Sequence, residues 1–229
     1  MAEAIFEVFR GNREGGKPVT YRVPVAPGMV VLDALHHIQA HQAPDLAVRW
    51  NCKAGKCGSC SAEVNGRPAH LQDPHGCPSP GQAHHGLSAE SVPHNQRPGH
   101  GCFLELSGEP EDSAVRAPPR AEWKMYPRDL DRVQEFRKCI ECFLCQNVCH
   151  VLREHEKMEE FGGPRYFVRV AALEMHPLNS KSRARVLKDE LGIGLCNITK
   201  CCTEVSPEEI HITDNAIIPL KELRGRRVL

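Results

Sequence analysis

The stretch KCIECFLCQNVCH, residues 138–150, decides how the second half of this chain is organised. Its four cysteines are separated by two, two and three residues. This spacing is typical of iron–sulfur ligation in two-cluster modules, in which three cysteines of a run bind one cluster and the fourth binds the other. A matching second run is therefore expected further along the chain.

The matching run begins at Cys196 and reads Cys196-x2-Thr199-x2-Cys202-x3-Ser206. Threonine and serine thus occupy two of its four ligand positions. Exchange of the last ligand between the runs predicts two clusters, and three thiolates suit a cluster with three irons. The expected ligands are Cys139, Cys142, Cys145 and Ser206 for a [4Fe–4S] cluster, and Cys149, Cys196 and Cys202 for a [3Fe–4S] cluster. Ser206 would bind as an alkoxide, a harder ligand than thiolate, which weakens the first site. Cys201 fits no ligand position and is expected to be a packed cysteine.

A third cysteine cluster lies in NCKAGKCGSC, residues 51–60. Cys52, Cys57 and Cys60 have four and two residues between them. Plant-type [2Fe–2S] sites use this spacing with a distant fourth cysteine, whereas zinc sites more often pair two C-x2-C units. The spacing favours a [2Fe–2S] site and leaves a zinc-binding structural or interaction module as the alternative.

Composition narrows the class of protein. The chain has 229 residues and 12 cysteines, and the start of the sequence lacks the basic-then-apolar layout of an export signal. In a reducing compartment, clustered cysteines indicate metal or redox chemistry rather than disulfides. The net charge of zero argues against a nucleic-acid partner. No apolar run reaches the length of a membrane span, so we expect no transmembrane segment.

Hydrophobic patterning predicts an α+β chain with two domains, 1–119 and 120–229. Residues 4–9 and 19–25 predict a β-hairpin, followed by a helix over 30–38, the cysteine loop and a short strand near 60–64. From Leu130 onward, apolar residues recur every three or four positions, which predicts an all-α second domain.

Residues 69–119 differ in kind from the rest. They hold 8 of the 18 prolines and 6 of the 13 histidines, but no lysine and only two β-branched residues, Val92 and Val115. Neither helical nor strand periodicity is visible, and a structureless stretch of this length is unusual inside a compact domain. The segment is therefore expected to be either a disordered insert or the product of a reading-frame error.

The quoted cysteine motifs, together with RWNCKAGKCGSCSAEVNGRP and LCNITKCCTEVSPEEIHITDNAIIPLKE, resemble the iron–sulfur subunit of succinate dehydrogenase and fumarate reductase, in its actinobacterial branch. The resemblance covers about 1–68 and 120–222. It implies a β-grasp, plant-type ferredoxin domain followed by an all-α bacterial-type two-cluster ferredoxin domain. It also implies a flavoprotein partner with FAD and a membrane anchor that binds quinone. The chain would relay electrons between them at the cytoplasmic side of the cell membrane and carry no catalytic residue of its own.

The family pattern is broken at two places. A fourth [2Fe–2S] cysteine is expected at position 72, where this chain has Gln72. If Leu71 is CTG and Gln72 is CAG, reading one base later gives TGC, a cysteine codon, so a pair of compensating frameshifts spanning 69–118 is our leading hypothesis. Near the quinone, His150, Glu154 and Asn197 stand where relatives carry other residues, so quinone contacts are not transferred. A subunit of another iron–sulfur oxidoreductase remains a second alternative.

Overall fold

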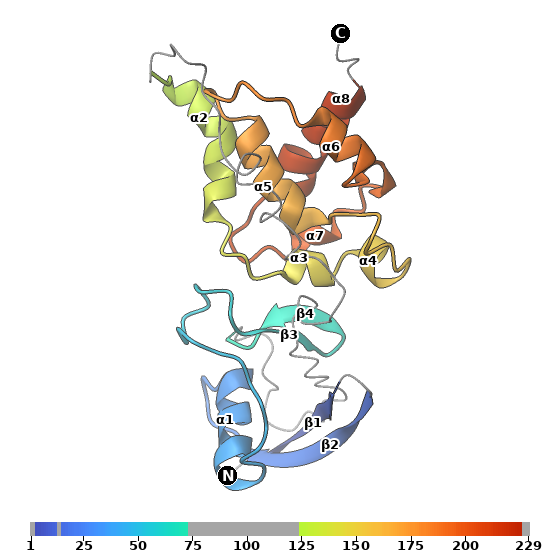
Figure 1. The fold of residues 1–229 in the computed structure, drawn as a ribbon. Coiled ribbons are helices and arrows are strands. Elements are labelled where there is room, and N and C mark those ends of the chain that lie inside the picture. Colours follow the sequence, from blue (N-terminus) through green and yellow to red (C-terminus); the bar gives the residue numbers. More distant parts are fainter. Residues whose placement is uncertain (1–2, 13–14, 73–123, 226–229) are drawn as a thin grey trace. The chain divides into compact units, whose positions relative to one another are not determined.

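A computed structural model describes residues 3–12, 15–72 and 124–225 (Figure 1). These residues form two compact units, one mainly from the chain before position 73 and the other mainly from the chain after position 123. Most of the unusual segment 69–119, with Cys77 and Cys102, lies outside the described residues. The predicted domain limits at 119 and 120 therefore stay a prediction.

The first unit begins with the predicted β-hairpin. Strand β1 (Glu3–Asn12) pairs antiparallel with β2 (Gly15–Pro24), and Phe6 lies opposite Tyr21. Alternate side chains of β1, such as Phe6 and Val8, are fully buried, as expected for a strand with one face on a core. Helix α1 (Val31–His41) buries Leu32, Leu35 and Ile38 in the same core.

A second hairpin carries the chain out of the cysteine loop. Strand β3 (Ser61–Val64) pairs antiparallel with β4 (Arg67–His70). The connecting residues Asn65 and Gly66 both have positive φ, at 52° and 77°, which is the preferred chemistry of a two-residue hairpin turn. Strand β3 confirms the prediction near 60–64, whereas β4 was not predicted.

Backbone hydrogen bonds fix the end of this hairpin. The Leu71 N–H donates to the Cys60 carbonyl at 3.0 Å, and the Leu71 carbonyl accepts from the Leu32 N–H, at the start of α1, at 2.9 Å. Leu71 is itself buried. Residue 72 is therefore held directly beside the cysteine loop.

The second unit is built from helices, and its described residues contain no strand. Two of its helices, α2 and α5, begin with proline, whose fixed φ suits the first helical position. The elements in chain order are α2 (Pro127–Gln134), η3 (Glu135–Lys138), α3 (Leu144–Asn147), α4 (His150–Arg153), α5 (Pro164–Glu174), α6 (Ala184–Asp189), η4 (Ile193–Leu195), α7 (Cys201–Glu204), η5 (Ile212–Ile217) and α8 (Ile218–Gly225). The all-α prediction is thus confirmed for the described part of this unit.

Around the first cysteine run the helices are shorter than the sequence pattern predicts. The apolar spacing of 141–161 indicated a helical stretch, but the structure has only the four-residue helices α3 and α4. Cys149 between them is extended, and Glu141 and Phe143 have positive φ. The apolar residues are buried by a chain that turns repeatedly and not by a continuous helix.

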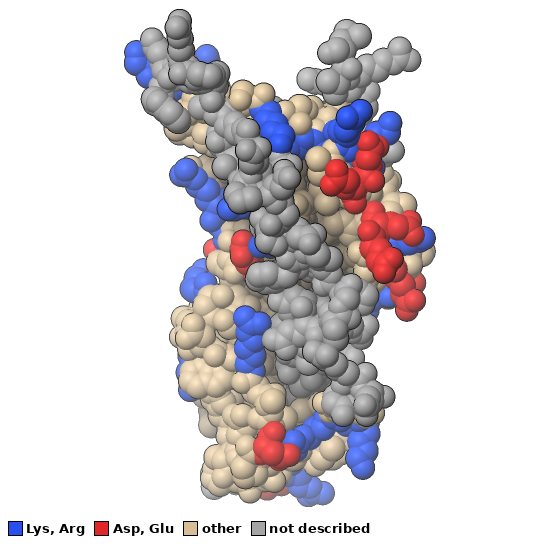
Figure 2. Space-filling view, viewed as in Figure 1, with Lys and Arg blue, Asp and Glu red and all other residues tan. Residues whose placement is uncertain are grey.

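The core of the second unit lies between α5, α6, η5 and α8. Phe167, Leu187, Ile217 and Leu220 are almost completely buried there, and the same cluster includes the thiols of several cysteines. No helix among the described residues is long and apolar enough to cross a bilayer. In Figure 2, basic and acidic side chains both occur on the viewed face, consistent with a net charge of zero.

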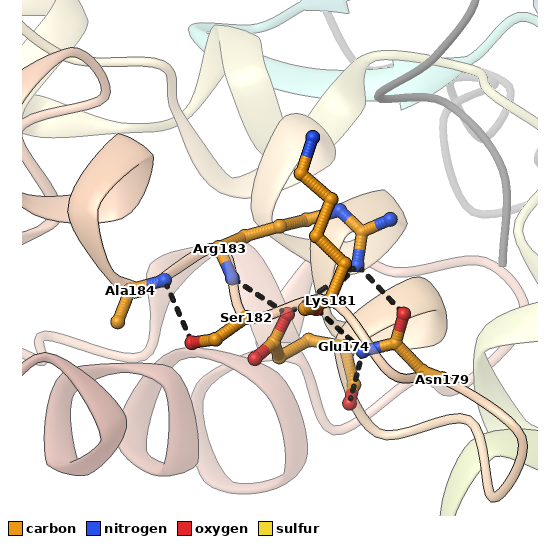
Figure 3. Close-up of polar contacts among 6 residues, drawn as sticks. All are labelled: Glu174, Asn179, Lys181, Ser182, Arg183 and Ala184. Carbon is orange, nitrogen blue, oxygen red and sulfur yellow. Dashed lines mark hydrogen bonds and ion pairs between the residues drawn. The ribbon is translucent and has the colours of Figure 1, made fainter. Parts of the chain in front are cut away.

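A buried polar cluster holds the connection from α5 to α6 (Figure 3). The Glu174 carboxylate accepts from the Arg183 backbone N–H at 3.0 Å and from its guanidinium at 3.4 Å. The guanidinium also donates to the Asn179 side-chain oxygen at 3.1 Å. The carboxylate and guanidinium are both buried, so removing either partner leaves an uncompensated charge, which typically costs about 3–5 kcal/mol.

Candidate metal centres

The loop of residues 51–60 directs backbone N–H groups at its thiols. The Cys52 sulfur accepts from the N–H groups of Ala54 and Lys56, each at 3.4 Å. The Cys57 sulfur accepts from the Ser59 N–H, also at 3.4 Å. Such donors stabilise a negatively charged sulfur, which is the form that binds iron.

Glycines make this loop geometry accessible. Gly55 and Gly58 have φ of 65° and 70°, and a Cβ on Gly55 would lie in open space. At these positions the backbone takes the left-handed conformation that favours glycine, and Lys53 adopts it as well with φ of 52°. The turns between Cys52 and Cys60 therefore follow from the sequence of the loop itself.

Electrostatics differ between the thiols of this loop. Hydrogen bonds from Ser59, together with those from Cys52, lower the pKa of Cys57 to about 6. At neutral pH the Cys57 side chain is mostly thiolate. Burial instead raises the pKa of Cys60, against the opposing effect of the backbone N–H groups of Leu71 and Gln72. Position 72 therefore lies next to Cys60, even though it carries glutamine.

His70 is a neighbour of Cys60 that the sequence patterns do not single out. Its Nδ1 lies 3.6 Å from the Cys60 sulfur. Both side chains are buried, with exposed fractions of 7% for His70 and 4% for Cys60. The Asn65-Gly66 turn could have revealed this contact, because a two-residue hairpin places residue 70 opposite residue 61.

In the helical unit, the thiols predicted to share a [3Fe–4S] cluster come from separate elements. Cys149 lies between α3 and α4, Cys196 follows η4, and Cys202 is in α7. Burial raises the pKa of Cys149 to about 11, and the charges of Cys201 and Cys202 contribute. Burial likewise raises the pKa of Cys202, with contributions from Cys201 and Cys196. These thiols therefore lie close enough to interact electrostatically.

Fewer interactions connect the ligands predicted for the [4Fe–4S] cluster. Cys139 follows η3, Cys142 precedes α3, and Cys145 lies within α3. Cys145 is buried in the helical core, and Cys139 packs against it. The Ser206 oxygen accepts a hydrogen bond from the Ile210 N–H at 3.0 Å, which makes it part of a turn. The assignment of Ser206 to this set stays a prediction.

Polar side chains around the helical cysteines were not foreseen from spacing. The Thr213 hydroxyl lies 3.4 Å from the Cys202 sulfur. Thr199, at the position that lacks a cysteine, has its hydroxyl 3.3 Å from both the Cys201 sulfur and the His150 Nδ1. Lys221 of α8 donates to the Cys196 carbonyl. The contacts of Thr199 with His150 and of Lys221 with Cys196 join residues distant in sequence, so no local motif predicts them.

The donor sets agree with iron–sulfur chemistry. The surroundings of the thiols combine backbone N–H donors in the loop with apolar packing in the helical core, the two features that tune such clusters. Within 3–12, 15–72 and 124–225, no three side chains of His, Cys, Asp or Glu are placed so that they could together hold a metal ion. The thiols of each group nevertheless lie near one another, and their chemistry fits clusters that are bound through sulfur.

Comparisons with known proteins agree with this interpretation. A family model described as a 2Fe-2S iron-sulfur cluster binding domain matches residues 5–77. A chain of the Mycobacterium smegmatis Sdh1 complex in the apo form is 43% identical, with a TM-score of 0.80, over 100% of this chain and 99% of that one. A fumarate reductase iron-sulfur subunit of Mycobacterium tuberculosis is 27% identical over 237 residues, covering 92% of this chain and 88% of its own length.

Some relatives are much longer. A subunit of the fumarate reductase (CoM/CoB) of Methanothermobacter marburgensis is 29% identical over 219 residues, covering 90% of this chain and 41% of its own length. The chain spans only about two fifths of the length of the archaeal curated relatives it matches. The full-length likeness to the mycobacterial chain confirms the predicted order of a β-grasp [2Fe–2S] domain and a mostly helical, cysteine-rich domain. The chain belongs to the family of iron–sulfur subunits of succinate dehydrogenase and fumarate reductase.

Proposed function

We propose that this chain is the electron-carrying subunit of a succinate:quinone oxidoreductase. Its partners would be a flavoprotein subunit with FAD and a membrane anchor subunit that binds quinone. Full-length likeness to a chain of a mycobacterial Sdh1 complex supports this assignment. The chain would be peripheral at the cytoplasmic side of the membrane, attached through the anchor.

The proposed cluster ligands are those of the three cysteine groups. Cys52, Cys57 and Cys60 hold a [2Fe–2S] cluster, Cys139, Cys142 and Cys145 with Ser206 hold a [4Fe–4S] cluster, and Cys149, Cys196 and Cys202 hold a [3Fe–4S] cluster. The observation that carries the proposal is the meeting of Cys149 with Cys202, more than fifty residues later, inside one apolar core. Exchange of ligands between two runs requires such a meeting.

Each part of the chain has a distinct task in this function. When bound, the clusters supply a series of one-electron carriers between the flavin and quinone. The loop of 51–60 stabilises thiolates through its N–H groups. The helical core excludes water from Cys145, Cys149 and Cys202, all of which are buried. Exclusion of water and nearby hydrogen bonds together set the reduction potential of a cluster.

Metal analysis and spectroscopy test this function. The chain is produced together with the flavoprotein and anchor subunits of its source organism, and iron, acid-labile sulfide and zinc are measured in the purified complex. We expect a brown complex with an EPR signal from oxidised [3Fe–4S], and reduction of a quinone analogue by succinate. A colourless, zinc-containing chain that does not associate with a flavoprotein would overturn the proposal.

DNA sequencing across codons 65–122 tests the frameshift hypothesis. Two compensating single-base changes would restore a cysteine at position 72 and replace most of the segment 69–118. Confirmation of the frame as written would leave Cys52, Cys57 and Cys60 with no cysteine at position 72. In that case a different donor must complete the first site.

A further inference from the structure

Three cysteines cannot complete a [2Fe–2S] site that needs four protein ligands. We propose that His70 supplies the fourth ligand in the chain as written, through Nδ1 and on the same iron as Cys60. The inference rests on the proposed function, since it presumes a cluster in the loop of 51–60. It assigns a role to a residue that lies outside the cysteine motifs.

The β3–β4 hairpin delivers His70 to the cysteine loop. His70 is the last residue of β4 and pairs with Ser61, the residue after Cys60. The Leu71 N–H continues the ladder by donating to the Cys60 carbonyl at 3.0 Å. The tight Asn65-Gly66 turn fixes this register, because slipping by one residue would move His70 to the opposite face. The backbone pairing of the hairpin therefore brings His70 close to Cys60.

The distance between the two donor atoms fits a shared metal ion. The His70 Nδ1 lies 3.6 Å from the Cys60 sulfur. At a tetrahedral ion with bonds of about 2.3 Å to sulfur and about 2.0 Å to nitrogen, the two donors lie roughly 3.5 Å apart. The geometry places both atoms where they could bind one iron with little rearrangement.

The four donors also divide into two pairs, as two irons require. Cys52 is a hydrogen-bonding neighbour of Cys57, and His70 is the neighbour of Cys60. We assign the first pair to one iron and the second pair to the other. In this assignment each iron is bound by two donors that are already neighbours in the structure.

Other side chains of this unit suit the task less well. Gln72 lies beside Cys60, but a neutral amide is a poor ligand for iron in a sulfur-rich site, whereas imidazole is a common one. The remaining described histidines of the unit lie on α1, where His36 packs on Trp50 and His37 stacks on His41. His70 is buried beside a thiol, which is where a ligand must be.

A histidine ligand changes the charge of the cluster. With neutral imidazole in place of a thiolate, the net charge of the cluster and its ligands is less negative by one. Replacement of thiolate by imidazole raises the reduction potential of [2Fe–2S] clusters. The first cluster of this chain should therefore be easier to reduce than an all-cysteine cluster in the same loop. Replacing His70 by cysteine should lower its potential.

Pulsed EPR of the reduced chain tests this ligand directly. The full chain, with the sequence as written, is expressed in two preparations, one labelled with 15N-histidine and one with natural histidine. The [2Fe–2S] EPR signal of each is examined for a strongly coupled nitrogen. We expect a coupling that changes on 15N-histidine labelling. It should vanish in His70→Cys, which keeps the cluster. His70→Ala should lose most of the [2Fe–2S] signal, and His41→Ala, an exposed histidine of the same unit, should change neither.

The outcomes separate this inference from the proposed function. A [2Fe–2S] signal without histidine coupling, or full coupling in His70→Cys, would overturn the role of His70. Absence of any [2Fe–2S] signal would overturn it as well, while the [3Fe–4S] signal of the oxidised chain still reports on the helical unit. Loss of both signals, with zinc in the protein, would overturn the function itself. His70→Cys guards against a folding defect in His70→Ala, since its retained signal shows an intact site.

Discussion

The surroundings of Cys57, in the cysteine loop of residues 51–60, and of Cys149, in the helical cysteine runs, shift the pKa values of the two thiols in opposite directions. In the loop, hydrogen bonds bring the pKa of Cys57 down to about 6, so the metal-binding form exists before metal arrives. In the helical core, burial raises the pKa of Cys149 to about 11, so a proton must leave when metal binds. Metal binding and folding are thus expected to be coupled more strongly in the helical unit than in the loop.

The largest expected contrast is in thiol reactivity of the metal-free chain. At pH 7 roughly nine-tenths of Cys57 but only about one in ten thousand of Cys149 would be thiolate. Cys57 should therefore react with iodoacetamide orders of magnitude faster, as peptide mass spectrometry over time would show. Equal rates in the folded chain would contradict the contrast. The unfolded chain in urea is the control, since there both thiols should react alike.

A second test concerns the buried ion pair of the helical unit. Glu174→Gln keeps the side-chain shape but leaves Arg183 buried without its carboxylate. We expect the free energy of unfolding to fall by about 3–5 kcal/mol, measured by urea titration of the purified chain. The exposed Glu222→Gln in α8 is the matched control and should change little. A loss in Glu174→Gln no larger than in the control would show that the pair does not hold α5 to α6.

Gln72→Cys sharpens the comparison at the first site. A thiolate beside Cys60 would compete with His70 and add one negative charge. We expect the [2Fe–2S] potential to fall by on the order of 100 mV. Redox titration followed by EPR measures the change, and the potential of the [3Fe–4S] signal in the helical unit serves as the internal control. An unchanged [2Fe–2S] potential would mean that position 72 does not reach the iron.

The smallest expected effect is pH-dependent and lies in the second unit. Glu135 accepts from the His211 N–H at 2.8 Å, and from its ring nitrogen at 2.7 Å. Burial would raise the Glu135 pKa, but these bonds and one from Asn215 outweigh it, so the pKa is lowered. Stability from the carboxylate is therefore present at neutral pH and lost as pH falls below 4.5, its ordinary value.

The measurement compares urea denaturation of wild type and Glu135→Gln between pH 7 and pH 3. The variant should be less stable by about 1 kcal/mol at pH 7 and close to wild type at pH 3. Glu159→Gln, which changes an exposed carboxylate in the same unit, should show no such convergence. A constant difference across the pH range would rule out the Glu135 carboxylate as its source.

Local patterns in the sequence predicted what is local in the structure. The alternation in β1 and the spacing in α1 were sufficient because each element buries one face. The cysteine spacings indicated three groups of thiols, and the assignment of these thiols as cluster ligands stays a prediction. Strand β4 was missed because its last residues fall in a segment whose prolines and histidines hid the pattern, although Asn65-Gly66 gave a turn signal.

Contacts between distant residues could not be predicted in this way. The bond from His211 to Glu135 joins residues 76 positions apart, and no motif relates them. The helical pattern of 141–161 was misleading because burial by successive turns leaves the same apolar spacing as burial along one helix face. The Thr213 hydroxyl beside Cys202 depends on packing that spacing does not encode, whereas the neighbour His70 could have been placed from the Asn65-Gly66 turn.

The short β3–β4 hairpin has a consequence for how the chain is made. The four donors that we propose for the first site, Cys52, Cys57, Cys60 and His70, lie within nineteen residues of one another, so that site would be complete soon after residue 70 leaves the ribosome. Cys149 must instead wait for Cys202 to be synthesised. The order of translation therefore separates the two assembly events in time, and the N-terminal site is the first that a metal-delivery system can meet.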